Sequence, residues 1–148
     1  HGHSVLMREM LAHIKKVMGV DPCIIAGNVA TPHAVKSLAD WGADIVKVGI
    51  GQGSPCTTKD KTGFTLPMFS CVKDCSGLFK GEMFGSKDFS SPIPIIADGG
   101  VRCNGDITKA LAAGAHMVMA GGCGFCYFFY FFCPIDKVQL PLDITDDV

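Results

Sequence analysis

Short apolar runs alternate with helical patterns along this chain, and glycine follows each apolar run within a few residues. Four such runs occur, at residues 22–26, 44–48, 93–97 and 116–120. Short runs that are apolar throughout are typical of strands buried on both faces of a parallel sheet. The alternation therefore predicts an α/β fold in which helices connect parallel strands.

Helical patterns fill most of the sequence between these runs. Helices are predicted over residues 5–18, 31–41, 66–78 and 105–113. Thr31 followed by Pro32 is a typical helix start, because a threonine side chain caps the first turn and proline suits the first helical position. Residues 81–91 are polar, contain glycine and lack periodicity, so we predict a surface excursion there.

Glycines gather at the carboxyl ends of three predicted strands, which is where α/β folds place their chemistry. They lie within residues 49–58, 98–100 and 121–122. A doubly wound dinucleotide-binding sheet is the alternative to a barrel, but residues 49–53 follow the pattern G-x-G-x-G and no acidic residue ends a following strand in the expected place. We therefore predict part of a (β/α)8 TIM barrel, with about four of its βα units.

The composition narrows the classes of function. Charged residues make up 18% of the chain and the net charge is −1, so the sequence lacks the basic surface that binds nucleic acid. The aromatic run at residues 125–132 is too short to span a membrane, although it favours aggregation if exposed. The start of the sequence shows no signal-peptide pattern. The eight cysteines are therefore expected to be reduced thiols of a cytoplasmic protein. The opening residues, HGHS, indicate a segment cut from a longer protein, beginning inside a loop.

The loop at residues 51–63 contains a candidate nucleophile. It reads GQGSPCTTKDKTG and places Cys56 between glycines and two threonines. A thiolate there would be stabilised by backbone amides and a nearby cation, which lowers its pKa and makes it a nucleophile. The alternative is a cysteine that serves only as a small apolar residue in a turn. Thr57 and Thr58, taken alone, are more typical of capping residues than of acid or base groups.

Asp98 ends the third predicted strand and is followed by Gly99 and Gly100. A carboxylate in this place can accept hydrogen bonds from two ribose hydroxyls, while the amides of the two glycines face a phosphate. The alternative is an aspartate that only caps a tight turn. Gly121 and Gly122 follow the next strand, and two adjacent strand ends with paired glycines favour a phosphate site.

Two cysteine pairs and two histidines are weaker candidates for metal binding. The pairs at residues 71–75 and 123–126 have spacings close to those of zinc ligands, but no second matched pair with histidines follows. His1 and His3 lie at the start of the chain, where solvated loop residues are the simpler interpretation.

Two long stretches resemble the family that unites IMP dehydrogenase and GMP reductase. KVGIGQGSPCTTKDKTGF and PIIADGGVRCNGDITKALAAGAHMVMAGG are similar to its active-site loop and its phosphate-binding strands. HGHS, IIAGNVATPHAV and CTTKDKTGF match the reductase pattern, whereas the dehydrogenase usually has Cys-Ile-Thr followed by a non-basic stretch. The resemblance covers residues 1–122, as a partial barrel domain, and residues 123–148 form a divergent tail that does not match.

The resemblance implies a barrel oxidoreductase of purine metabolism, usually a homotetramer, that converts GMP to IMP and ammonia with NADPH. Cys56 matches the nucleophile that attacks purine C2 and leaves a covalent thioimidate. Thr58 matches the threonine that shuttles a proton to the leaving amine, together with a glutamate from a later loop. The remaining matches are Ile50 and Gly51 for the cofactor, Gly51, Gly53, Cys56 and Lys59 for a potassium ion, and Asp98, Gly99, Gly100, Gly121 and Gly122 for the ribose and phosphate of the substrate.

The sequence also departs from this family. The family's first strands, with residues that hold the nicotinamide cofactor, would precede residue 1, and the segment between Cys56 and Asp98 is longer than in the family. After Gly122 the loop with the catalytic glutamate is replaced by CGFCYFFYFFCPIDKVQLPLDITDDV. We therefore expect the isolated chain not to turn over GMP. The alternatives are a segment of IMP dehydrogenase, which oxidises IMP with NAD through the same thiolate, and a non-catalytic partner that binds an intact reductase through the open edges of the partial barrel.

Overall fold

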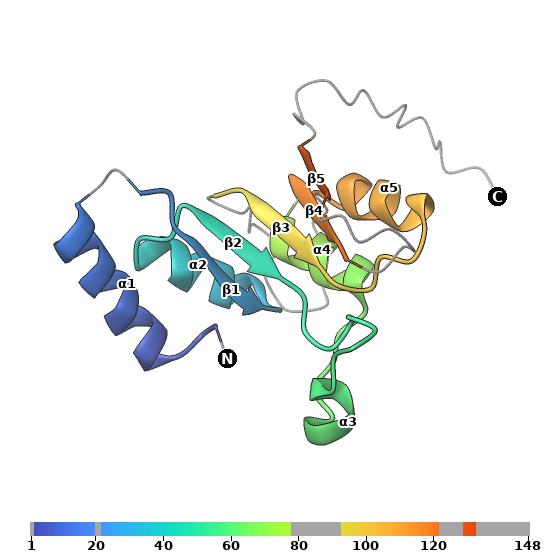
Figure 1. The fold of residues 1–148 in the computed structure, drawn as a ribbon, viewed down its shortest axis with the longest axis horizontal. Helices are drawn as coiled ribbons and strands as arrows, with labels where there is room; N and C mark the ends of the chain where they lie inside the picture. The colour runs from blue at the N-terminus through green and yellow to red at the C-terminus, as the bar shows by residue number, and fades with distance from the viewer. Residues whose placement is uncertain (1, 20–21, 78–92, 122–128, 133–148) are drawn as a thin grey trace, which may run out of the picture.

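The computed structural model describes residues 2–19, 22–77, 93–121 and 129–132 (Figure 1). In this part of the chain one sheet has five strands, in the order β1-β2-β3-β4-β5. The elements along the chain are α1 (Val5–Met18), β1 (Ile25–Val29), α2 (Pro32–Asp40), β2 (Ile45–Val48), α3 (Thr58–Thr62), α4 (Met68–Ser76), β3 (Ile95–Asp98), α5 (Asn104–Ala112), β4 (Met117–Ala120) and β5 (Phe129–Phe132).

The first four strands are parallel and lie side by side in the order in which they occur in the sequence. A doubly wound sheet reverses its strand order at a switch point, whereas a barrel adds each strand beside the previous one. Helices connect each strand to the next, as parallel pairing requires. The order therefore agrees with the predicted partial barrel and not with the doubly wound alternative.

The two best-defined helix starts follow directly from the sequence. The Ser4 hydroxyl accepts a hydrogen bond from the backbone N–H of Met7 at 3.2 Å, which caps the first turn of α1. The Thr31 hydroxyl accepts one from Ala34 at 3.3 Å, and Pro32 occupies the first position of α2. These contacts confirm both predicted starts.

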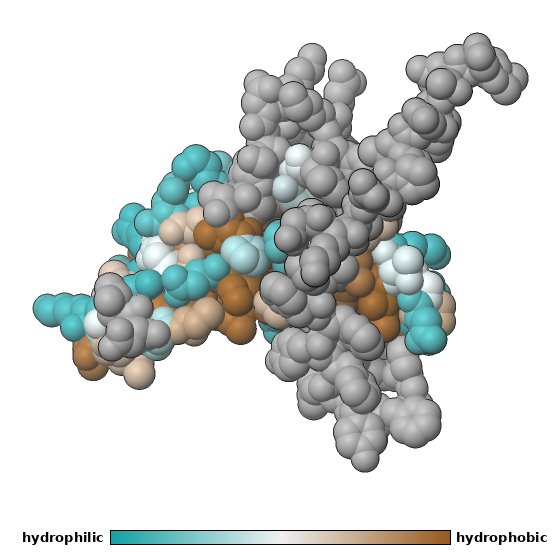
Figure 2. Space-filling model, turned by 90° about the horizontal axis from the view of Figure 1, so that it is seen from above, coloured by the Kyte–Doolittle hydropathy of each residue, from teal (hydrophilic) through white to brown (hydrophobic). Residues whose placement is uncertain are grey.

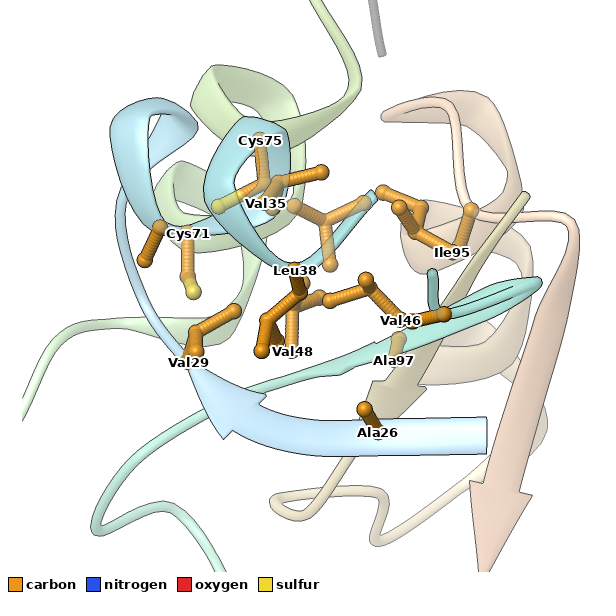
Figure 3. Packing of buried hydrophobic residues seen from close by; sticks show 14 of the residues in the cluster. Ala26, Val29, Val35, Leu38, Val46, Val48, Cys71, Cys75, Ile95 and Ala97 are labelled. Carbon is orange, nitrogen blue, oxygen red and sulfur yellow. The ribbon is translucent and has the colours of Figure 1, made fainter. Parts of the chain in front are cut away.

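Helices α2, α4 and α5 cover one face of the sheet. Their apolar side chains pack onto alternate strand residues, because successive side chains of a strand point to opposite faces (Figure 3). The buried cluster between the layers includes Val35 and Leu38 of α2, Cys71 and Cys75 of α4, and Ala26, Val29, Val46, Val48, Ile95 and Ala97 of the strands.

The opposite face of the sheet is only partly covered. Ile25 of β1 keeps 51% of its surface exposed, whereas Ile95, Ile96 and Ala97 of β3 are all buried. Figure 2 accordingly shows hydrophobic surface in the middle of the molecule. The prediction that the strands are buried on both faces is correct for β3, inside the sheet, and wrong for β1, which is an edge strand of the described sheet.

The first strand lies further along the chain than the apolar run indicates. Pairing with β2 begins at Ile25 and Ile45, not at residue 22, and the strand extends to Val29. Just before the ladder, the backbone N–H of Ile24 donates to the Asp44 carboxylate at 2.8 Å. The carbonyl oxygen of Ile24 accepts the backbone N–H groups of Asp44 and Ile45, so Ile24 is already tied to the start of β2.

Two elements were not predicted from the sequence. The five-residue helix α3 forms within the cysteine loop, and Gly63, at φ 71°, ends it. The strand β5 pairs with β4 antiparallel, with Ala120 opposite Phe129 and Met117 opposite Phe132. From the sequence, this aromatic run indicated only a risk of aggregation.

No helix in the described ranges is long and apolar enough to cross a membrane. The predicted surface excursion at residues 81–91 lies outside the described residues, as does most of the divergent tail.

Candidate active site

Cys56 lies in the loop that leaves the carboxyl end of β2. The loop folds back on itself, since the backbone N–H of Cys56 donates to the carbonyl oxygen of Gly53 at 3.0 Å. The thiol is half-buried, and α3 begins two residues later at Thr58. The side chain is therefore sheltered by its own loop and still partly open to solvent.

The surroundings of Cys56 favour the thiolate form. The side chain of Thr58 and then its backbone N–H hold the pKa of Cys56 below its usual value, with smaller contributions from the Gly51 backbone and the positive charge of Lys59. Partial burial opposes this effect and does not cancel it. A half-buried thiol with a lowered pKa is the pattern expected of a nucleophile.

The lowered pKa predicts the pH dependence of alkylation by iodoacetamide. Since only the thiolate reacts, the half-maximal rate at Cys56 should occur at a lower pH in the folded chain than in the chain unfolded by urea. Quenched alkylation followed by peptide mass spectrometry measures both profiles. Thr58→Val removes the hydroxyl and should move the folded profile back towards the unfolded one. Identical profiles for the wild type and Thr58→Val would contradict this account of Cys56.

The loops after β2 and β3 are packed against each other through glycines. A Cβ atom added to Gly99 would lie 2.9 Å from the backbone nitrogen of Gly53, and one added to Gly100 would lie 3.2 Å from Cβ of Gln52. Both Gly99 and Gly100 have positive φ, at 106° and 77°. Glycine is thus needed here for close approach as well as for backbone conformation. The structure places the Cys56 loop directly beside the predicted phosphate-facing glycines.

The Asp98 carboxylate is held by two polar side chains that the sequence analysis missed. Its Oδ2 atom lies 2.8 Å from Nζ of Lys47 and accepts a hydrogen bond from Nδ2 of Asn28 at 2.9 Å. The same amide of Asn28 donates to the carbonyl oxygen of Gly49. Both partners bind Oδ2, so Oδ1 is the atom that a ligand hydroxyl would meet. The available signal was the presence of a lysine and an asparagine inside otherwise apolar strand sequences.

Gly121 directly follows β4, beside the loop after β3. The register pairs Asp98, the last residue of β3, with Met119, and β4 continues to Ala120, directly before Gly121. Gly121 is exposed, and a Cβ atom there would meet nothing within 4 Å. Gly122 lies outside the described residues.

Residues 65–66, which follow α3, are hydrogen-bonded to the start of the Cys56 loop. Nε2 of Gln52 donates to Oγ1 of Thr65 at 2.9 Å and also to the carbonyl oxygen of Leu66. The backbone N–H of Leu66 donates to the carbonyl oxygen of Ile50 at 3.3 Å. Gly51 is buried against Thr65. Ile50 and Gly51, the predicted cofactor contacts, thus belong to the framework of the loop.

The predicted alternatives for metal binding find no support among the described residues. Within those residues no group of three or more His, Cys, Asp or Glu side chains could hold a metal ion. Cys71 and Cys75 are buried in the core, and the hydrogen bond between them, together with burial, raises the pKa of Cys75. The pair at residues 123–126 lies outside the described residues. His3 is exposed, as predicted, although its ring stacks on Trp41 with centroids 5.4 Å apart.

Comparison with known proteins identifies the family. The profile of the IMP dehydrogenase / GMP reductase domain matches residues 1–124. GMP reductase of Mesoplasma florum is 47% identical over 123 residues, which cover 82% of this chain and 35% of that protein. Inosine-5'-monophosphate dehydrogenase of Chlorobaculum tepidum is 47% identical over 121 residues, which cover 82% of this chain and 22% of that protein.

The structural comparison agrees with the sequence comparison. A crystal structure of a GMP reductase variant from Trypanosoma brucei matches with a TM-score of 0.70 and 39% identity, covering 82% of this chain and 26% of that one. The parallel sheet is accordingly part of a TIM barrel. The chain spans between 22% and 35% of the length of these relatives. Both kinds of relative are oxidoreductases. The chain belongs to the IMP dehydrogenase / GMP reductase domain family.

Proposed function

We propose that this chain supplies the nucleophile and the nucleotide-binding strands of a GMP reductase-type site, which converts GMP to IMP and ammonia. The observation that carries the proposal is the position of Cys56. Its thiol has a lowered pKa and lies on a loop packed against Gly99 and Gly100. A thiolate beside a phosphate-facing loop is arranged to attack the base of a bound nucleotide.

In the proposed reaction the sulfur of Cys56 adds to C2 of the purine. The bond from C2 to the exocyclic amine then breaks, and ammonia leaves with a proton that passes through the hydroxyl of Thr58. NADPH supplies hydride to C2 when it is bound. The bond from C2 to sulfur then breaks, its electron pair returns to Cys56 as the thiolate, and IMP is released. The hydroxyl of Thr58 is suited to its role because it already interacts with the Cys56 sulfur.

The ribose and phosphate contacts in this proposal come from two strand ends, those of β3 and β4. Asp98 accepts hydrogen bonds from the ribose hydroxyls through Oδ1, since Lys47 and Asn28 hold Oδ2. The amides of Gly99, Gly100 and Gly121 face the phosphate in this proposal, and Gly122, which lies outside the described residues, is assigned to the same contact. Hydrogen bonds from hydroxyls to a carboxylate are stronger than those to a neutral acceptor.

The cofactor and potassium sites fit the described residues only in part. Ile50 and Gly51 are the residues that would contact NADPH, and the carbonyl oxygen of Ile50 already accepts the N–H of Leu66. Potassium would be bound by carbonyl oxygens of Gly51, Gly53, Cys56 and Lys59. Those of Gly53 and Lys59 already accept backbone N–H groups, so each would offer its second lone pair.

A pair of chimeric enzymes tests the proposal. Residues 1–124 of this chain replace the matching segment in the Mesoplasma florum GMP reductase and, separately, in the Chlorobaculum tepidum dehydrogenase. Absorbance at 340 nm follows NADPH consumption with GMP in the first chimera and NADH formation from IMP and NAD in the second. We expect activity in the reductase chimera. Activity confined to the dehydrogenase chimera would favour the alternative, IMP dehydrogenase.

A further inference from the structure

We propose that Asp106 is a positioning residue for the nucleotide phosphate, because its carboxylate fixes the loop that carries Gly99 and Gly100. This inference rests on the proposed function, in which the amides of those glycines face the phosphate. Asp106 lies in the first turn of α5, three residues after the N-cap residue Cys103. Its side chain bonds to Arg102, in the loop between β3 and α5.

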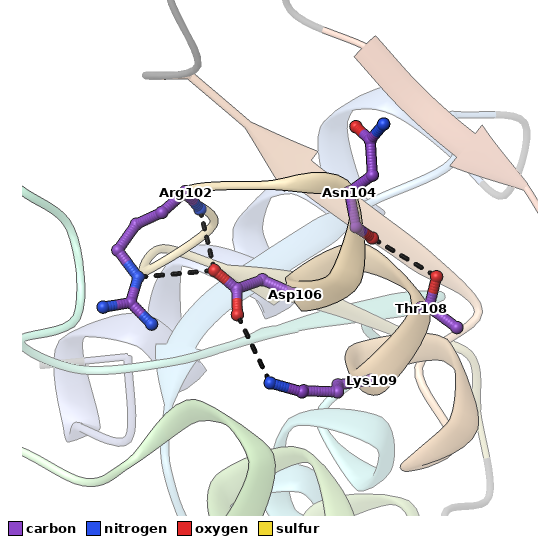
Figure 4. Close-up of polar contacts among 5 residues, drawn as sticks. All are labelled: Arg102, Asn104, Asp106, Thr108 and Lys109. Carbon is purple, nitrogen blue, oxygen red and sulfur yellow. Dashed lines mark hydrogen bonds and ion pairs between the residues drawn. The ribbon is translucent and has the colours of Figure 1, made fainter.

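The contacts of Asp106 converge on one loop residue. Its Oδ2 atom accepts hydrogen bonds from the backbone N–H of Arg102 at 3.0 Å and from Nε of the same residue at 3.3 Å (Figure 4). Its Oδ1 atom lies 3.9 Å from Nζ of Lys109. Only 15% of the Asp106 side chain is exposed, compared with 84% of the Arg102 side chain. The carboxylate is thus the sheltered, fixed member of the pair.

This pattern differs from an ordinary helix cap. In a capping box, the side chain at the third helical position accepts the N–H of the N-cap residue, which here is Cys103. Asp106 instead accepts the N–H of Arg102, one residue further outside the helix. The hydrogen bond therefore restrains the loop more than it completes the helix.

The loop needs a restraint at this point. Its start is held by Asp98, which Lys47 and Asn28 bind. Its middle contains two consecutive glycines with positive φ, and glycine has the widest choice of backbone conformations. Packing against Gln52 and Gly53 limits the movement of these glycines, and the anchors on either side of them help to set the direction of their amides. Asp106 provides one anchor at the end of the loop, through a charged acceptor, which makes the stronger kind of hydrogen bond.

Titration of the full chain with IMP and with inosine tests this inference, because the two ligands differ only in the phosphate. Isothermal titration calorimetry should show that Asp106→Ala weakens IMP binding about 10-fold, as expected for loss of a charge-assisted hydrogen bond that positions the phosphate-binding amides. Inosine binding should stay within about 2-fold of the wild type, which is within the scatter of such effects. Asp106→Asn keeps an acceptor without the charge and should give an intermediate loss. Lys109→Met removes the neighbour of the other oxygen and should leave both ligands unaffected.

The outcomes separate this inference from the proposed function. If the wild type binds neither IMP nor inosine, the nucleotide site itself is wrong and the inference falls with it. If the wild type binds IMP and both Asp106 variants bind it equally well, only the role of Asp106 is overturned. Equal losses for IMP and inosine would likewise overturn it, since they indicate a general structural effect. Should Asp106→Ala not fold by circular dichroism, the Asp106→Asn variant decides by the same comparison.

Discussion

Replacing Cys56 by serine is expected to lower turnover of GMP by the reductase chimera by at least about 10³-fold. A serine hydroxyl has nearly the same size as the thiol but is far less acidic, so the hydrogen bonds from Thr58 cannot make it an anion at neutral pH. The bond to purine C2 then does not form. The rate of NADPH consumption measures the loss, and intact-protein mass spectrometry should show that the variant accumulates no covalent adduct with GMP.

Cys103→Ser is the matched control for this variant. Cys103 is also a free cysteine near a strand end, but it is exposed and precedes α5 instead of facing the loop of Thr58. We expect the rate of the control to stay within about 2-fold of the wild-type chimera, as for most surface substitutions. If Cys56→Ser retained a tenth of the wild-type rate, covalent catalysis by Cys56 would be wrong.

The alternation of strands and helices could be predicted because both signals are local. Apolar runs of five residues and helix caps such as Thr31 depend on neighbours within one turn or one strand. The start of β1 could not be predicted in the same way. Just before the strand, Ile24 bonds to Asp44 and Ile45, which lie about 20 residues away in the sequence. The exposure of Ile25 likewise depends on its place at the sheet edge, which is a property of the assembled sheet.

The elements that were missed are those with weak local signals. Helix α3 has five residues and no side-chain cap, so nothing in its sequence distinguishes it from the rest of the loop. The strand β5 is stabilised by its pairing with β4, and the partner of an antiparallel strand cannot be read from the strand's own residues.

The candidate site shows the same division between local and distant signals. Cys56 and Asp98 could be predicted because each follows a strand, and parallel strands place their carboxyl ends at one edge. The contact between their loops agrees with that expectation. Lys47 and Asn28 were missed because their roles depend on sheet register, which brings residues 28, 47 and 98 together. The hydrogen bonds from Arg102 to Asp106 were missed because they depend on the conformation of the loop before α5, which the sequence spacing of the two residues does not predict.

Replacing Gly49 by alanine is expected to lower the free energy of unfolding by about 3 kcal/mol or more, since it combines backbone strain with overpacking. Gly49 has φ 128°, a conformation that residues with a side chain rarely adopt. An added methyl group would collide with the backbone oxygen of Asp98 and would lie 2.7 Å from Cε of Met68. Urea denaturation followed by far-ultraviolet circular dichroism measures the change.

Gly63→Ala separates the two causes of that loss. Gly63 also has positive φ, at 71°, but an added Cβ atom there would meet nothing within 4 Å. Its substitution should therefore cost only the strain of the left-handed conformation, about 1–2 kcal/mol. The difference between the two variants reports the packing of Gly49 against the end of β3 and against Met68 of α4. If Gly49→Ala destabilised the chain no more than Gly63→Ala, the two loops would not be held in the close contact on which the proposed nucleotide site depends.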